Sequence, residues 1–114
     1  MAIQVIYLRD YEIRVHDSIV ATIKVYNDKS KTSYAALPTI AEIREALGES
    51  ATGETVREIH LSNCFSDCNS LVIAPDIPDG VTNMSGCFLG CSSLNVAPTI
   101  PNGVTSMANC FYEC

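Results

Sequence analysis

Two consecutive segments decide how the second half of this chain folds: residues 64–86, CFSDCNSLVIAPDIPDGVTNMSG, and residues 87–109, CFLGCSSLNVAPTIPNGVTSMAN. They are identical at 13 of 23 positions, and a third copy starts with CFYEC at residues 110–114. A fixed period of this length marks a repeat architecture, in which each unit is too short to bury its apolar side chains alone. We therefore expect successive units to stack on one another.

The six cysteines follow this period and fall into two columns of three. Phenylalanine and leucine recur in the same way, which is typical of side chains that share a core. The expected core columns are Cys64, Cys87 and Cys110; Cys68, Cys91 and Cys114; Phe65, Phe88 and Phe111; and Leu71 and Leu94. We expect the same interior to hold Ile73, Ile77, Val81 and Met84 stacked on Val96, Ile100, Val104 and Met107.

Each unit is expected to contribute one parallel strand, at residues 71–74 and 94–97, about 4.8 Å from the next. The Cys-Phe-x-x-Cys stretch before the strand suits a short helical turn. Proline and glycine in residues 75–80 and 98–103 predict a corner after each strand, because proline lacks an N–H donor and glycine tolerates positive φ.

These segments resemble the BspA-type leucine-rich repeats of bacterial and prophage surface proteins. The resemblance rests on CFLGCSSL at residues 87–94 and IPNGVTSM at residues 100–107, and it covers residues 56–114. It implies a leucine-rich-repeat-like parallel solenoid with 23-residue coils and a role in adhesion or host contact.

Residues 1–50 follow a different pattern. Apolar and polar residues alternate over residues 3–7, 13–15 and 19–25, which predicts three half-buried strands. Thr39 and Glu42 form a capping-box pair before apolar residues at helical spacing, and Gly48 ends that pattern, so we expect one helix.

The sequence thus predicts an α+β fold with two domains. Residues 1–50 are expected to form a small α/β domain of three strands and one helix, which caps or attaches the repeats. After a linker at residues 49–54, residues 56–114 are expected to form the short solenoid, incomplete at its C-terminal end. Its last apolar face is expected to be covered by further chain or by a partner subunit.

The cysteine pairs have three interpretations. Zinc is disfavoured, because structural zinc sites prefer Cys-x2-Cys or mixed Cys/His sets to the Cys-x3-Cys spacing found here. Disulfides within or between units stay an open alternative that requires an oxidising compartment. Buried free thiols acting as small hydrophobic side chains are the preferred interpretation.

No combination of residues indicates catalysis. Residues 16–18, His-Asp-Ser, have the residue types of a hydrolase triad, but neighbours in a turn direct their side chains apart. His60 alternates with apolar neighbours and is interpreted as an exposed or hydrogen-bonded side chain. Asp76 and Asp79 are replaced by threonine and asparagine in the next unit, which argues against calcium. We expect no catalytic residue, no bound metal and no cofactor.

Positions that differ between the units are expected to face outward. The expected interaction surface consists of Val72, Asn95, Asp76, Thr99, Asp79 and Asn102. Val72 and Asn95, on the expected strand face, are the first choices for contact. Stacked repeats present extended surfaces, so we expect a protein or a glycan partner there.

Charge and hydropathy limit the partners. Seven basic and thirteen acidic residues give a net charge of -6, so the nucleic-acid backbone would be repelled. No apolar run approaches the roughly 20 residues that span a bilayer, and the N-terminus lacks the pattern of a signal peptide. We expect cytoplasmic synthesis, no membrane insertion, and a homo-oligomer or attachment to a particle.

These expectations favour a non-catalytic interaction or structural protein. The leading hypothesis is a phage or prophage virion-associated protein, such as a head fibre, decoration or tail protein, because virion proteins assemble without secretion. A bacterial cell-surface adhesin is an alternative that the repeat resemblance supports. A small intracellular inhibitor of a host protein is a second alternative, based on the acidic surface.

Overall fold

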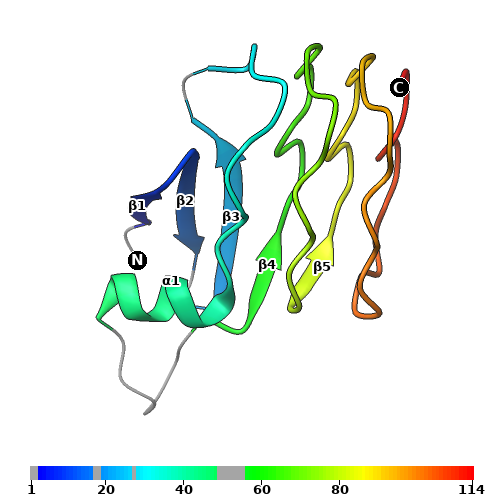
Figure 1. The fold of residues 1–114 in the computed structure, drawn as a ribbon. Coiled ribbons are helices and arrows are strands. Elements are labelled where there is room, and N and C mark those ends of the chain that lie inside the picture. The colour runs from blue at the N-terminus through cyan, green and yellow to red at the C-terminus, as the bar shows by residue number, and fades with distance from the viewer. Residues whose placement is uncertain (1–2, 17–18, 27, 49–55) are drawn as a thin grey trace.

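The computed structural model describes residues 3–16, 19–26, 28–48 and 56–114. Five strands lie in one mixed sheet, in the order in which they occur along the chain (Figure 1). The elements are β1 (Gln4–Leu8), β2 (Tyr11–His16), β3 (Val20–Val25), α1 (Ile40–Leu47), β4 (Glu58–His60) and β5 (Val81–Asn83).

The sheet joins the two halves of the chain. β1, β2 and β3 are antiparallel neighbours, whereas β3, β4 and β5 are parallel. One row of paired residues, Val15, Ala21, Ile59 and Val81, crosses from β2 to β5 and is buried along its length. The pairing of β3 with β4 therefore places the N-terminal strands and the repeats around one core.

The predicted fold class is wrong. In place of an α/β domain followed by a leucine-rich-repeat-like solenoid, the described residues form a mostly-sheet structure with one five-stranded mixed sheet and one short helix. The physical reason is that the second half forms little regular strand of its own, namely three residues each in β4 and β5 and two isolated bridges. It completes a sheet that the N-terminal strands begin. The predicted linker, residues 49–54, lies outside the described residues, and the domain boundary stays a prediction.

Strand pairing between the repeats also occurs in a different place from the predicted one. Residues 71–74 and 94–97 form no strand and meet only at a single bridge, between Ile73 and Val96. β5 and a bridge from Asn83 to Ser106 lie instead in the Val-Thr stretch of each unit. Prolines directly after residues 71–74 and 94–97 remove ladder donors, which explains why no strand develops there.

The three N-terminal strands and the helix are confirmed as elements. The hydroxyl of Thr39 accepts a hydrogen bond from the N–H of Glu42 at 3.2 Å, and the carboxylate of Glu42 accepts one from the N–H of Thr39 at 3.1 Å. Gly48 ends the helix with a φ of 70°. Ile43 is the helix residue that is fully buried in the core.

The burial pattern of β1 is the reverse of the expected one. Ile3, Val5 and Tyr7 are exposed, whereas Ile6 and Leu8 pack against the core. The register explains the difference, because Ile6 pairs with the buried Ile13 of β2 and Leu8 with the buried Tyr11. Residues paired across strands share one face of a sheet. The alternation in residues 3–7 predicts the strand, but it does not show which of the two sets of side chains faces the core.

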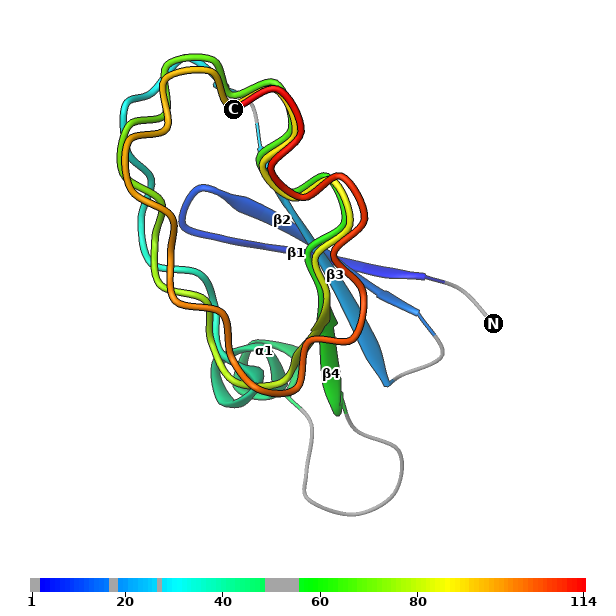
Figure 2. The ribbon, with the colours of Figure 1, turned by 90° about the vertical axis from the view of Figure 1, so that its right-hand side faces the viewer.

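Successive units follow nearly the same path (Figure 2). The rings of Phe65, Phe88 and Phe111 stack almost in parallel, with centroid distances of 5.3 and 5.6 Å and interplanar angles of 1° and 7°. The N–H of Phe65 donates to the carbonyl of Cys87 at 2.8 Å, and the N–H of Phe88 donates to that of Cys110 at 2.9 Å. The flanking donors in these turns, Asn63, Asp67, Gly86 and Gly90, also bond to carbonyls of the following unit.

Two positions in each Cys-Phe turn have positive φ. They are occupied by Asn63 (58°) and Asp67 (61°) in the first turn and by Gly86 (64°) and Gly90 (76°) in the second turn. A Cβ atom on Gly86 would collide with the side chain of Asn63, and one on Gly90 with that of Asp67. The first turn has room for the side chains of Asn63 and Asp67 because the second turn has glycine at both corresponding positions.

We expect Gly86→Ala to destabilise the protein more than Gly48→Ala. Both glycines have positive φ, which costs about 1–2 kcal/mol for an alanine, but only the methyl group at residue 86 collides with a neighbour. The contact is with the flexible end of the Asn63 side chain, so its displacement should add roughly 0.5–1.5 kcal/mol to the loss in unfolding free energy, measured by urea titration. Combining Asn63→Gly with Gly86→Ala should remove most of this additional loss. Equal losses of unfolding free energy for Gly86→Ala and Gly48→Ala would contradict the close contact between residues 63 and 86.

Candidate interaction surface

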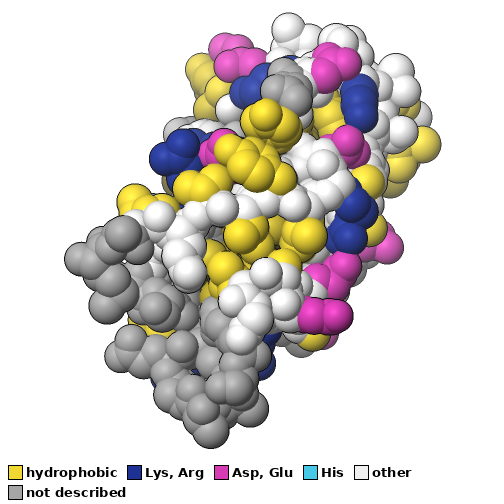
Figure 3. Space-filling model, turned by 90° about the vertical axis from the view of Figure 1, so that its left-hand side faces the viewer, with side chains coloured by type: hydrophobic (Ala, Val, Ile, Leu, Met, Phe, Trp, Pro, Cys, Tyr) yellow, Lys and Arg dark blue, Asp and Glu magenta, His cyan; other side chains and the backbone are white. Residues whose placement is uncertain are grey.

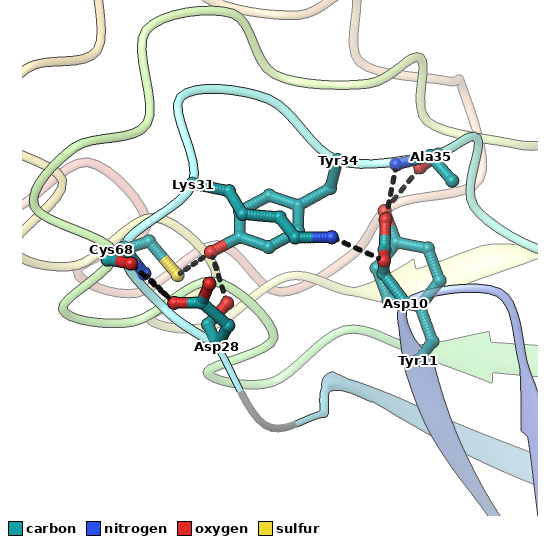
Figure 4. A network of polar contacts seen from close by, with 8 residues as sticks. Asp10, Tyr11, Asp28, Lys31, Tyr34, Ala35 and Cys68 are labelled. Carbon is teal, nitrogen blue, oxygen red and sulfur yellow. Dashed lines mark hydrogen bonds and ion pairs between the residues drawn. The ribbon is translucent and has the colours of Figure 1, made fainter.

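The loop at residues 28–37 ties the repeats to the β1–β2 turn (Figure 4). The carboxylate of Asp10 accepts a hydrogen bond from the N–H of Ala35 at 2.7 Å and lies 2.9 Å from the ammonium group of Lys31. The Ala35 hydrogen bond first, and the Lys31 contact second, lower the pKa of the Asp10 carboxyl. Tyr34 donates to the carbonyl of Asp28 at 2.8 Å. The loop is thereby held at several points along its length.

This loop forms the first layer of an extended face. The carbonyl of Thr32 accepts hydrogen bonds from the N–H groups of Val72 at 2.9 Å and Ile73 at 3.5 Å. The carbonyl of Val72 accepts one from the N–H of Asn95 at 3.0 Å. The segments around residues 32, 72 and 95 consequently lie side by side.

Exposed side chains recur at every third residue along this face. They are Ile73, Asp76 and Asp79 in one unit and Val96, Thr99 and Asn102 in the next. A three-residue spacing is that of an extended polyproline II chain, and each segment contains two prolines. We call these six residues the ridge.

The ridge overlaps the expected interaction surface. Asp76, Asp79, Thr99 and Asn102 belong to both sets and are exposed. Of the two first choices, Asn95 is exposed and Val72 is half-buried, and each precedes a ridge residue. All six residues of the expected interaction surface therefore lie on the ridge or directly beside it, and their role in binding stays a prediction.

The expectation that Ile73 and Val96 lie in the core is wrong. Their side chains are 64% and 62% exposed, and the two residues meet at the bridge between the units. In an irregular extended segment, hydrophobicity alone does not show which side chains point inward, because no strand alternation fixes the faces. The ridge thus carries two adjacent aliphatic side chains in contact with solvent.

Most residues of the other expected core columns are buried or partly buried, but Met107, also expected in the interior, is exposed. Every cysteine except Cys114 is buried, as are Phe65, Phe88 and Leu71. Leu94 and Phe111 are partly buried against the core. Cys114 is exposed, contrary to the expectation, because the face of the third unit that it borders is uncovered in the described residues.

We expect Leu71→Ala and Ile73→Ala to differ sharply in stability, although the two residues are close in sequence. Leu71 is fully buried, so its truncation should cost about 2–5 kcal/mol of unfolding free energy. Ile73 is exposed, so its truncation should change that free energy by less than about 0.5 kcal/mol. Urea titration of both variants measures the difference. A large loss of unfolding free energy for Ile73→Ala would show that the Ile73 side chain is buried in the core.

The buried cysteines have free thiols in an environment that suppresses ionisation. Burial raises the pKa of the Cys64 and Cys87 thiols well above the usual range. Burial, followed by the proximity of Cys68 and Cys114, raises the pKa of Cys91 to about 12. The Cys91 thiol donates to the carbonyl of Phe65 at 3.0 Å. Because the thiolate is the reactive form, these side chains suit packing and not nucleophilic chemistry.

Alkylation with iodoacetamide at pH 8 should label Cys114 first in the folded protein. Cys114 is exposed, while Cys64, Cys87 and Cys91 are both buried and protonated at that pH. Intact-mass spectrometry followed by peptide mapping should show one fast site, with all six cysteines reacting only after denaturation. Labelling of Cys87 as fast as that of Cys114 would contradict the burial described.

The two histidines lie on the outer face of the sheet, away from the ridge residues in sequence. His16 borders a shallow hollow over β2 and β3 that Glu12, Arg14 and Lys24 also line. Arg14 pairs with Glu12 at 2.8 Å. The Nε2 atom of His60 lies 3.3 Å from the carboxylate of Glu58. The remaining residues of the 16–18 motif, Asp17 and Ser18, lie outside the described residues.

The described residues contain neither a metal-binding cluster nor a membrane-spanning helix, and the chain matches no other protein in three comparisons. No group of three or more His, Cys, Asp or Glu side chains in the described part of the chain is arranged to hold a metal ion. No helix formed by these residues has the length and apolar character needed to cross a membrane. Comparison with protein-family models, with curated proteins and with solved structures finds no match to this chain.

Proposed function

We propose that this chain is a non-catalytic interaction protein that binds a protein or a glycan through the ridge, as a component of a phage or prophage virion. The observation that carries the proposal is the pair of aliphatic side chains, Ile73 and Val96, held next to each other and more than half exposed. Adjacent apolar side chains in contact with solvent, bordered by polar ones, are typical of a binding surface.

The flanking ridge residues define the chemistry of the partner. Asp76 and Asp79 provide carboxylates beside Ile73, while Thr99 and Asn102 provide hydroxyl and amide groups beside Val96. A suitable partner surface offers an apolar contact at its centre and hydrogen-bond donors or cationic groups at its rim. The loop at residue 32 and the hydrogen bonds between units hold these backbones in place, which limits the entropy lost on binding.

A binding function agrees better with the described residues than catalysis does. The thiols that could act as nucleophiles are buried and protonated, apart from Cys114. In the outer hollow, the guanidinium of Arg14 is paired with the carboxylate of Glu12. The sequence resemblance of residues 56–114 to BspA-type repeats supports a role in surface contact.

Particle loading tests this proposal with two matched variants. In virions purified after prophage induction, Val96→Asp should reduce the amount of this protein bound to the particle about tenfold or more. The reason is that the substitution places a carboxylate in the apolar centre of the ridge. Tyr112→Asp adds the same charge at a 57% exposed position outside the ridge and should load normally. Quantitative mass spectrometry measures both.

Wild-type protein that is missing from purified particles would disprove the virion setting. Equal loading of Val96→Asp and wild-type protein would disprove the role of the ridge. Circular dichroism of both variants ensures that a loss of loading reflects the contact and not unfolding.

A further inference from the structure

β1 is an edge strand of the five-stranded sheet, and no other described strand pairs with its outer side. It pairs with β2 only. The strand at the opposite edge, β5, is continued by the bridge from Asn83 to Ser106. A free edge presents a row of unpaired N–H and C=O groups, which is a template for a further strand.

The register shows which backbone groups are free. Leu8 and Tyr11 flank a two-residue turn, so they form a hydrogen-bonded pair, and the same holds for Ile6 with its partner on β2. Val5 and Tyr7 occupy the intervening positions. Their N–H and C=O groups consequently point away from β2, toward the free edge.

The same residues carry exposed apolar side chains. Ile3, Val5 and Tyr7 are 49%, 42% and 53% exposed, and the ring of Tyr26 lies 4.8 Å from that of Tyr7. Seen from the β1 end of the molecule, hydrophobic side chains form a band across this face (Figure 3). The outer edge of β1 thus presents both unpaired backbone groups and exposed apolar side chains.

The edge lacks the devices that usually prevent strand addition. Residues 3–8, IQVIYL, contain no charged residue, proline or glycine, and the pairing of β1 with β2 runs without a bulge. Natural edge strands are commonly protected by such features. Their absence indicates that this edge is normally paired.

The uncharged, apolar composition of β1 favours a second copy of this chain as the occupant. The chain has a net charge of -6, so two copies repel each other at most approaches. β1 itself contributes no carboxylate to a contact, and its apolar residues are self-complementary when the strand meets its own copy in the antiparallel direction. The pairing also continues the antiparallel ladder that β1 and β2 already form.

We propose that β1 pairs with β1 of a second copy about a two-fold axis at Val5. Val5 then lies opposite the partner's Val5, and Tyr7 lies opposite the partner's Ile3. Each pair exchanges two N–H···O bonds, since the free groups of both strands point toward the joint. The two sheets become one continuous sheet, and the exposed apolar side chains cover one another on its outer face.

Sedimentation equilibrium over a dilution series tests the dimer. The full chain should show twice its mass of 12.3 kDa. Val5→Lys places two ammonium groups at the axis and should raise the dimer dissociation constant about tenfold or more. Ile73→Lys makes the same charge change at an exposed residue of the ridge and should leave the dimer intact, which separates this proposal from the ridge function.

Hydrogen exchange identifies the interface directly. The Val5 and Tyr7 amides should be protected in the wild-type dimer and exchange rapidly in Val5→Lys, while the Ile6 amide, bonded to β2, stays protected in both. A wild-type mass of one chain, a dimer unaffected by Val5→Lys, or a dimer whose Val5 amide exchanges freely would overturn the proposal. The last result would indicate pairing through another surface, and a heteromeric mass in a mixed sample would indicate a different partner for β1.

Discussion

The packing around the ring of Phe65 is the contact on which the rest of the structure depends. One side of the ring stacks on Phe88, while Tyr34 and the buried Tyr11 approach it at centroid distances of 5.7 and 6.0 Å. Tyr11 belongs to β2, Tyr34 to the loop at residues 28–37 and Phe88 to the second unit. Three parts of the chain that cannot bury enough apolar surface separately therefore share one core.

Local patterns were predictable from the sequence, and long-range pairing was not. The capping box of Thr39 and Glu42 and the alternation in the first three strands depend on neighbouring residues, and the structure has them. The parallel pairing of β3 with β4 joins distant segments, and β4 has only three residues. Three residues are too few for a sequence pattern that would identify β3 as the strand with which β4 pairs. The single mixed sheet could therefore not be predicted from the sequence.

The ridge, likewise, was predictable from the sequence only in part. Variation between units located Asp76, Thr99, Asp79 and Asn102 on an exposed face, because a stacked core constrains its own positions and leaves the outer ones free. Ile73 and Val96 vary little in hydrophobicity, so the same reasoning placed them inside. Their exposure follows from the path of the backbone at Thr32 and Val72, which the sequence does not specify.

The backbone hydrogen bonds that link one Cys-Phe turn to the next run in one direction, from an N–H of one turn to a carbonyl of the following turn. Their peptide dipoles add along the axis of the stack, as they do in a helix. The N–H groups at the corresponding positions of the third unit, including that of Phe111, lie at the positive end of this array. The Cys-Phe side of the described residues thus has an electrical polarity that the net charge of -6 does not show.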